Sequence, residues 1–381
     1  MHLEQIRVRG FRNIEGLQWR PAEGLNLVWG DNGQGKTNLL EAIHMVSTGR
    51  SFRTRREGEC RPWAARGHSL EPTRLEGDLM RRTGGRHVRV VLGDGWKRVQ
   101  AEGTLVRRLA DLWAETAVVT FTPEASGVFK ASPTERRRLL DMAFSHISKD
   151  YLANLQRYGQ TLRQVNTALK QPDEDASVRE TVNAYLPMLA QTAARVIAVR
   201  GRRLEQARPA VALRFDRLGG HGRLELQYVP NLQTALQREG LSPASLRDRI
   251  EQTAAALHKH YQAAFREARA TGSMPHGPHR DDLAIYLDGQ DLRRYGSQGQ
   301  HRLAALTLKL EIARWIEEAL GESPVLLFDD FGSELDPDRR EAVLEGFRGR
   351  MQVFVTATRP SDLGRERLFG QSRRIIAGRL H

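Results

Sequence analysis

Cysteine is nearly absent from this chain, and so are the segments that carry proteins into or across membranes. The single cysteine, Cys60, excludes an internal disulfide and a zinc site built from several cysteines, which favours a reducing cytoplasm. No stretch approaches the roughly 18 uninterrupted apolar residues of a membrane span. Residues 1–20 hold several charges and no apolar core, which is not typical of a signal peptide. We therefore expect a cytoplasmic protein rather than an intact membrane transporter.

Acidic residues are outnumbered by basic ones, 46 to 59, which leaves a net charge of +13 over 381 residues. Such a surplus favours a polyanionic partner, because each Lys or Arg that neutralises a phosphate releases counterions. A GC-rich genome that encodes arginine freely is the alternative explanation. The basic clusters lie at residues 53–56, 81–82, 107–108, 136–138 and 200–203. The usual explanation of any one such cluster is a solvated face, but several together with the net charge favour contact with a phosphate backbone. Since the sequence shows no recognition helix, zinc finger or aromatic RNA-binding motif, we expect such binding to be largely sequence-independent.

The order of apolar patterns predicts an α/β fold that is interrupted by a helical insertion. Short strand patterns and glycine-rich turns fill the first 130 residues, and a capping box with proline at the first helical position, Ser132-Pro133-Thr134-Glu135, opens a helical part. The strand pattern returns at Asp281. We predict a head whose N-terminal part is 1–130, a mainly helical lid at 131–270, and a C-terminal part of the head at 271–381.

Within the predicted lid, three helical regions can be distinguished. Apolar residues spaced four and three apart from Tyr151 to Leu169 are typical of a coiled-coil-like seam, most simply the core of the lid itself. A second helix is expected over 177–208, with Pro187 kinking or interrupting it. A third is expected from about Ser242 to Ala270.

The strongest motif lies near the N-terminus. It fits G-x-x-x-x-G-K-[ST] and stands between a buried strand pattern and a helical pattern, and its residues are Gly30, Asp31, Asn32, Gly33, Gln34, Gly35, Lys36 and Thr37. The glycines let backbone N–H groups point at phosphate oxygens, and the helix N-terminus adds its dipole. We predict that these residues bind ATP, with Lys36 at the β/γ-phosphates as a catalytic residue and the Thr37 hydroxyl on Mg²⁺.

A second motif, Val325-Leu326-Leu327-Phe328 followed by Asp329 and Asp330, reads as a buried parallel strand that ends in two acids. Carboxylates at the carboxyl end of such a strand face the phosphates in an α/β nucleotide site. Alone they would be solvated acids in a loop, but the upstream P-loop favours functional roles. Asp329 is the predicted Mg²⁺ ligand, directly or through water, and Asp330 the catalytic residue that orients or deprotonates the attacking water.

A third motif precedes the helix that leads to this strand. Ser297, Gly299 and Gln300 match the S-x-G-Q core of the ABC signature, which presents a second helix N-terminus to a γ-phosphate. In that architecture the phosphate belongs to the nucleotide of the other subunit, so ATP would join two copies head to tail. Asp336, in Ser333-Glu334-Leu335-Asp336, matches the interfacial loop of ABC ATPases.

Together with Phe11-Arg12-Asn13, Pro123-Glu124 and the run from Gly277 to Asp282, these motifs resemble the RecF family of bacterial repair proteins in order and spacing. The resemblance implies an ABC-type P-loop ATPase head with mixed sheets and a helical lid. It also implies ATP-dependent homodimerisation on double-stranded or gapped DNA, slow hydrolysis, and work with RecO and RecR to load RecA. Similar heads contact nucleotide through residues such as Arg12 and Asn13, although a surface turn is an alternative for both.

Several positions depart from transport-type ABC proteins. Asp330 stands where those proteins carry glutamate, which predicts slow turnover, and Thr356-Ala357-Thr358 stands where they carry a switch histidine. Glu124 is the nearest candidate for their glutamine-loop residue. We expect His279 and its neighbours to link lid and head, with Arg280 paired to an acid, rather than to bind a metal. The alternative functions are a nucleotide-binding subunit of an ABC transporter and a small-molecule P-loop kinase.

Overall fold

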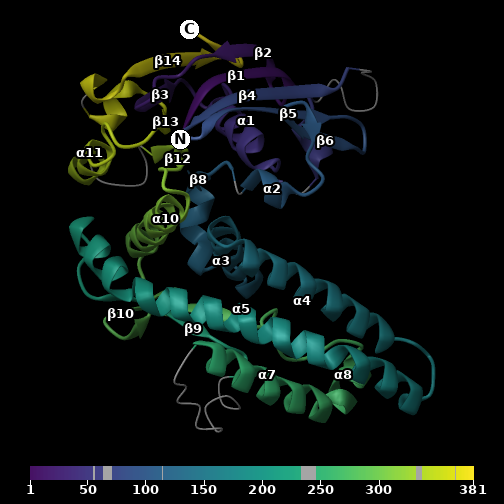
Figure 1. The fold of residues 1–381 in the computed structure, drawn as a ribbon. Coiled ribbons are helices and arrows are strands. Elements are labelled where there is room, and N and C mark those ends of the chain that lie inside the picture. Colours follow the sequence, from purple (N-terminus) through teal and green to yellow (C-terminus); the bar gives the residue numbers. More distant parts are fainter. Residues whose placement is uncertain (55, 63–70, 114, 233–245, 332–336, 365) are drawn as a thin grey trace. The chain divides into compact units, whose positions relative to one another are not determined.

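The strand patterns at the two ends of the sequence come together in one unit of the computed structural model (Figure 1). This unit, the head, consists of Met1–Gly127, Phe215–His221 and Ser297–His381, and a second unit, the lid, consists of Val128–Arg214 and Gly222–Gly296. The structure describes residues 1–54, 56–62, 71–113, 115–232, 246–331, 337–364 and 366–381.

The first sheet of the head is antiparallel, with the strand order β2-β1-β4-β5-β6-β7. Its strands are β1 (His2–Phe11), β2 (Ile14–Trp19), β4 (Thr73–Arg81), β5 (Gly84–Leu92), β6 (Lys97–Ala101) and β7 (Thr104–Leu105). Apolar side chains alternate with polar ones along β4 and β5, so Leu75, Val88 and Val90 lie in the core. The other face of this sheet therefore carries the polar and charged side chains.

The second sheet of the head has the order β15-β14-β3-β13-β12-β8 and is parallel except for β15. Its strands are β3 (Leu25–Trp29), β8 (Val118–Phe121), β12 (Val325–Phe328), β13 (Val353–Ala357), β14 (Gln371–Ile376) and β15 (Arg379–Leu380). β12 and β13 are buried over their whole length, as parallel strands covered on both faces should be.

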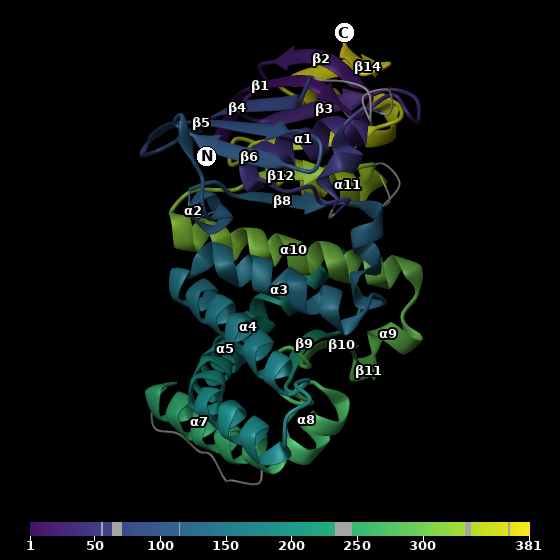
Figure 2. The ribbon, with the colours of Figure 1, turned by 90° about the vertical axis from the view of Figure 1, so that its right-hand side faces the viewer.

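Helix α1 (Lys36–Thr48) lies between the two sheets of the head (Figure 2) and contacts β1, β4 and β5 of one and β8 and β13 of the other. Leu39, Ile43 and Val46 from this helix are fully buried in the shared core. The remaining helices of the head are α2 (Leu109–Trp113), α10 (Gln298–Leu320), α11 (Pro337–Glu345), and the short 3-10 turns η1 (Glu57–Cys60), η5 (Pro360–Leu363) and η6 (Glu366–Leu368). A further 3-10 turn, η3 (Pro123–Phe129), ends at the boundary with the lid. This arrangement fixes the P-loop at the carboxyl end of β3.

The lid is mainly helical, with a three-stranded sheet of order β11-β10-β9. Its elements are α3 (Pro133–Ile147), α4 (Lys149–Ala168), α5 (Asp175–Arg217), β9 (Leu224–Val229), α7 (Leu246–Ala263), α8 (Phe265–Thr271), β10 (Asp282–Leu287), β11 (Gln290–Asp291) and α9 (Leu292–Tyr295). Tyr158, Val165 and Leu169 pack against Leu189 and Leu257, which confirms that the seam belongs to the lid core.

Two predictions about the lid are corrected. Residues 271–296 were assigned to the head, but they lie in the lid because β10 pairs with β9 over six residues. Pro187 was expected to kink or interrupt its helix, and the interruption is not seen, since α5 continues through Pro187 and Pro209. An internal proline costs about 3 kcal/mol, and burial of the neighbouring Leu186 and Leu189 in the lid core offsets that cost. The predicted helix start near Ser242 lies outside the described residues.

Within the described ranges, no helix is both long and apolar enough to cross a bilayer.

Candidate nucleotide-binding site

The loop between β3 and α1 can follow its path only because it has glycine at two close approaches. A Cβ atom at Gly30 would lie 2.5 Å from the carbonyl oxygen of Ile375, and one at Gly35 would lie 2.8 Å from the Oδ1 atom of Asn13. Both glycines also have positive φ angles, 154° and 112°. The two positions therefore require glycine for backbone geometry as well as for phosphate access.

Side chains on either side hold this loop in place. The backbone N–H groups of Ala377 and Gly378, in the turn between β14 and β15, donate to Gln34 Oε1 at 2.7 Å and to Gln34 O at 2.9 Å. Asn13 donates from Nδ2 to Gly33 O at 3.2 Å, and Asn38 donates to Asn13 Oδ1 at 2.8 Å. Gln34 and Asn13 thus position the P-loop, and their direct contact with nucleotide stays a prediction.

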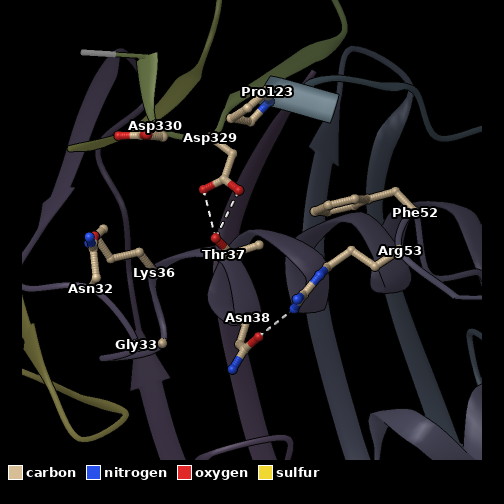
Figure 3. A pocket seen from close by; sticks show the side chains of 11 residues that line it. Asn32, Gly33, Lys36, Thr37, Asn38, Phe52, Arg53, Pro123, Asp329 and Asp330 are labelled. Carbon is tan, nitrogen blue, oxygen red and sulfur yellow. Dashed lines mark hydrogen bonds between the residues drawn. The ribbon is translucent and has the colours of Figure 1, made fainter. Parts of the chain in front are cut away.

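A pocket of about 430 Å³ opens over the loop (Figure 3). It is lined by Asn32, Gly33, Gly35, Lys36, Thr37, Asn38, Phe52, Arg53, Pro123, Asp329 and Asp330. The Lys36 ammonium donates to Gly30 O at 2.6 Å and Asp31 O at 3.0 Å. Burial lowers the pKa of Lys36, and the carboxylates of Asp330 and Asp329 oppose that shift. A phosphate would offer this ammonium a charged acceptor in place of two carbonyls.

Thr37 and Asp329 bring the two halves of the predicted site together across 292 positions of sequence. The Thr37 hydroxyl donates to Asp329 Oδ2 at 2.8 Å and lies 3.0 Å from Oδ1 (Figure 3). Hydroxyl and carboxylate oxygens are ligands that Mg²⁺ accepts, usually together with water and substrate phosphates. The described residues contain no cluster of three or more His, Cys, Asp or Glu suited to a metal.

Thr356, which the sequence marked only as part of the segment in place of a switch histidine, contacts both aspartates of the site. Its hydroxyl donates to Asp329 Oδ1 at 2.8 Å and accepts from the backbone N–H of Asp330 at 2.8 Å. Thr356 lies at the end of β13, which pairs with β12, so a polar residue at a buried strand end was the available signal. Asp330 has a φ of 50°, an uncommon conformation for a residue other than glycine that this bond helps to hold.

A further wall of the pocket was also missed. Phe52 and Arg53 lie there, although the sequence grouped Arg53 with a basic cluster for DNA. The Arg53 guanidinium donates to Asn38 Oδ1 at 2.9 Å (Figure 3) and lies 3.6 Å from Glu41 Oε2. Arg53 therefore adds positive charge on the side of Asn38. Pro123 completes this wall.

Arg12 lies close to the loop but its guanidinium faces α1. It donates to both carboxylate oxygens of Glu41 at 2.6 and 2.7 Å and to Glu59 O at 3.0 Å. Glu41 is fully buried and also accepts from the Ser51 hydroxyl at 2.5 Å. Arg12 thus ties the first strand turn to α1, and its contact with nucleotide stays a prediction.

Ser297 begins α10, as the signature motif requires. Its hydroxyl accepts from the Gln300 N–H at 3.2 Å, and the Gln300 side chain accepts from the Ser297 N–H at 2.8 Å. Ser297 and Gly299 are exposed, and neither they nor Gln300 are among the described residues that line the pocket of their own chain. Asp336 and the rest of the predicted interfacial loop lie outside the described residues.

The run from Gly277 to Asp282 is part of the lid, which corrects its predicted place at a lid–head link. Among the described residues, the ion pairs of this run involve Asp281 and Asp282 and not, as predicted, Arg280. Asp282 accepts from Arg136 at 2.8 and 2.7 Å, and Asp281 lies 3.9 Å from Arg200. These contacts join the run to two helices of the lid, α3 and α5.

Comparison with known proteins agrees with this geometry. Residues 5–106 match a family model described as an AAA domain. The chain is 36% identical over 364 residues to the DNA replication and repair protein RecF of Symbiobacterium thermophilum, covering 95% of this chain and 93% of the relative. It is 33% identical to RecF of Halalkalibacterium halodurans, covering 97% and 95%.

Solved structures confirm the predicted fold class. A structure of the recombination mediator protein RecF with ATP in the RecFOR pathway is similar over 100% of this chain and 97% of that chain, with a TM-score of 0.87 and 29% identity. An SMC head bound to the C-winged helix domain of ScpA has a TM-score of 0.55 at 15% identity, covering 100% of this chain and 96% of that chain, and it shares the fold alone. The fold is an ABC-type ATPase head with mixed sheets and an inserted helical region.

Proposed function

The chain belongs to the RecF family of DNA replication and repair proteins, and from that membership we propose that it is a DNA-binding ATPase of recombinational repair. One observation carries the ATPase part: the hydrogen bond between Thr37 and Asp329, which brings the P-loop and the acidic strand end to one pocket. The similar structure of RecF with ATP supports ATP as the ligand. Family membership sets aside the transporter subunit and the small-molecule kinase.

Hydrolysis would use residues already lining the pocket. Lys36 exchanges its carbonyl partners for the β/γ-phosphates, and Asp330 orients or deprotonates the attacking water. Thr37 and Asp329 would hold Mg²⁺, which supplies positive charge against the phosphates. Because aspartate is one methylene shorter than the glutamate of transport-type proteins, we propose slow turnover suited to a switch.

The signature would act on a second copy of the chain. Ser297 and Gly299 are exposed at the start of a 23-residue helix, whose N-terminal N–H groups and dipole suit a γ-phosphate. With Gln300 and Asp336 they would bind the ATP of the partner subunit, so that ATP holds a homodimer together. The dimer would then bind double-stranded or gapped DNA largely without sequence preference, and with RecO and RecR it would help to load RecA.

The test is solution mass with ATP and magnesium. Wild type should convert from monomer to dimer, whereas Lys36→Arg and Ser297→Arg should stay monomeric. Ser132→Arg is a matched control, because Ser132 starts α3 with the same capping box but belongs to no signature. The proposal is supported if wild type and Ser132→Arg form dimers and the other two variants do not. A wild-type monomer at saturating ATP, with and without DNA, would contradict the role of Ser297 across the dimer.

A further inference from the structure

The solvent face of the antiparallel head sheet carries two neighbouring rows of side chains that differ in charge balance. In the first, which we call the balanced row, Arg7, Glu76 and Arg89 are register partners on β1, β4 and β5. Arg89 lies 2.8 Å from Glu76, and Arg7 lies 3.6 Å from Glu76 and 3.4 Å from Asp78. The arginines of this row therefore have carboxylate partners.

The second row, which we call the arginine row, lies one step along the same strands. Arg9 pairs in register with Arg74, Arg74 with Val91, and Val91 with Arg98 on β6. All three arginines are exposed. In the part of the chain that the structure describes, no carboxylate lies within ion-pair distance of any of them, and Arg98 contacts the Trp96 ring at 6.0 Å. Three positive charges thus cross the sheet without an acid.

This arrangement is unfavourable for the sheet by itself. Directly opposed side chains on antiparallel strands have Cβ atoms about 5 Å apart, and like charges at such a pair are destabilising. Arg9 and Arg74 form such a pair, while the next pair along the same two strands, Arg7 and Glu76, joins opposite charges. The fold can therefore place carboxylates beside the arginines of this face, and it does so in the neighbouring balanced row. A ligand that supplies the missing negative charge explains the difference.

We propose that Arg9, Arg74 and Arg98 bind phosphates along one nucleic-acid backbone, an assignment that rests on the proposed DNA binding. Three strand spacings separate β1 from β6, which is about 14 Å at roughly 4.8 Å each. That length corresponds to about four phosphate-to-phosphate steps along one duplex strand, at roughly 3.4 Å of axial rise each. The row lies on the face of a sheet, and guanidinium contacts to phosphates carry no sequence information. The surface therefore suits sequence-independent binding.

The test compares two double variants of the full-length chain that remove the same charge from adjacent rows. Arg9→Gln/Arg74→Gln removes two members of the arginine row, and Arg7→Gln/Arg89→Gln removes two from the balanced row. Binding of labelled duplex DNA is measured with ATP over a range of salt concentrations. The first variant should flatten the slope of log K against log salt by about 1.8, at roughly 0.9 per lost phosphate contact, and the second should keep the wild-type slope. Arg98→Gln should flatten it by about 0.9.

Other outcomes separate this inference from the function on which it rests. If wild type binds DNA and the Arg9/Arg74 variant keeps its slope, the arginine row is not the contact, although DNA binding stands. If both double variants lose slope equally, net charge alone matters and the row assignment fails. If wild type binds no DNA, the proposed function fails and the row loses its ligand with it. Binding to anionic phosphatidylserine vesicles is measured in parallel. If the Arg9/Arg74 variant loses binding to these vesicles and keeps its binding to DNA, the partner of the arginine row is a lipid surface. The melting temperature of the Arg9/Arg74 variant should equal or exceed that of wild type, because the variant removes a pair of opposed like charges.

Discussion

The head and the lid each contain two consecutive aspartates beside a strand, and their surroundings differ. Asp329 and Asp330 follow β12 and line a pocket of about 430 Å³. The hydroxyls of Thr37 and Thr356 donate to Asp329. Asp281 and Asp282 stand at the start of β10, inside the lid.

In the lid, guanidinium groups lie beside the two aspartates, and the Tyr228 hydroxyl also donates to Asp281. Arg136 donates to both oxygens of Asp282, and Arg200, which is 2% exposed, lies between Asp141 and Asp281. A hydroxyl satisfies a carboxylate without adding positive charge, whereas a guanidinium neutralises it. The aspartate pair of the head therefore remains available to a cation at the pocket, whereas the aspartate pair of the lid stabilises the fold.

Asp330→Asn should have the largest effect, and this effect should be on the rate of ATP hydrolysis. If Asp330 orients or deprotonates water, ATP hydrolysis should drop about 10²–10⁴-fold, because the amide cannot accept the proton. ATP binding should change little, since Lys36 and Thr37 remain. Single-turnover hydrolysis and equilibrium ATP binding are the two measurements.

Asp282→Asn is the control for this variant, because it makes the same change in the second aspartate of the lid pair. It should leave hydrolysis per folded molecule at the wild-type rate. Equal losses of hydrolysis in both variants would remove the distinction between the two pairs.

Arg200→Met should have the next largest effect, and it should fall on stability. It leaves Asp141 and Asp281 without their shared buried cation, which costs about 3–5 kcal/mol when one partner of a buried pair is removed. Arg203→Met, three residues along α5 at an exposed position, is the matched control and should be nearly neutral. Urea unfolding measures both, and a loss below about 1 kcal/mol for Arg200→Met would show that the cluster is dispensable.

The comparison also explains what could be predicted from the sequence. Gly30, Lys36 and Thr37 lie within eight residues, and Asp329 follows its strand directly, so local pattern was sufficient. Thr356 and Arg53 needed the fold, because only strand pairing and loop packing bring them to the pocket.

In the lid, long sequence separation hid the partners. Arg136 reaches Asp282 over 146 residues, and no spacing rule connects them. For that reason the sequence named Arg280 as the residue paired to an acid and did not identify Arg136 or Arg200 as the partners of the two aspartates. The sequence likewise left a kink or an interruption open at Pro187, since local propensity carries no information about tertiary packing.

His279 should give the lid a pH dependence of intermediate size. Burial lowers the pKa of His279 to about 4, although Met274 O, 3.1 Å from its Nε2, works against the shift. Its unfolded pKa is about 6.5, so between these values the unfolded chain binds a proton that the folded chain does not. Stability should therefore fall as pH drops from about 6.5 to 4, by about 1–3 kcal/mol.

The measurement for His279 is urea unfolding at several pH values, for wild type and for His279→Gln. The variant should lose this part of the pH dependence, and His221→Gln, at an exposed position in the head, should keep it. Parallel pH profiles for wild type and His279→Gln would contradict the assignment.

Thr356→Val should have the smallest effect, and it should lower both stability and the rate of ATP hydrolysis. It removes a hydroxyl that donates to Asp329 and accepts from the Asp330 N–H, while keeping the shape of the side chain. The lost hydrogen bonds predict about 1–2 kcal/mol less stability, and hydrolysis should slow because Asp330 loses the acceptor of its N–H and Asp329 loses one of its hydroxyl donors. Thr358→Val, at the same strand end, is the control. The informative readout is the magnesium concentration for half-maximal hydrolysis. It should rise in Thr356→Val, because Asp329 loses a donor that orients it, and an unchanged value would mean that Thr356 does not position this carboxylate.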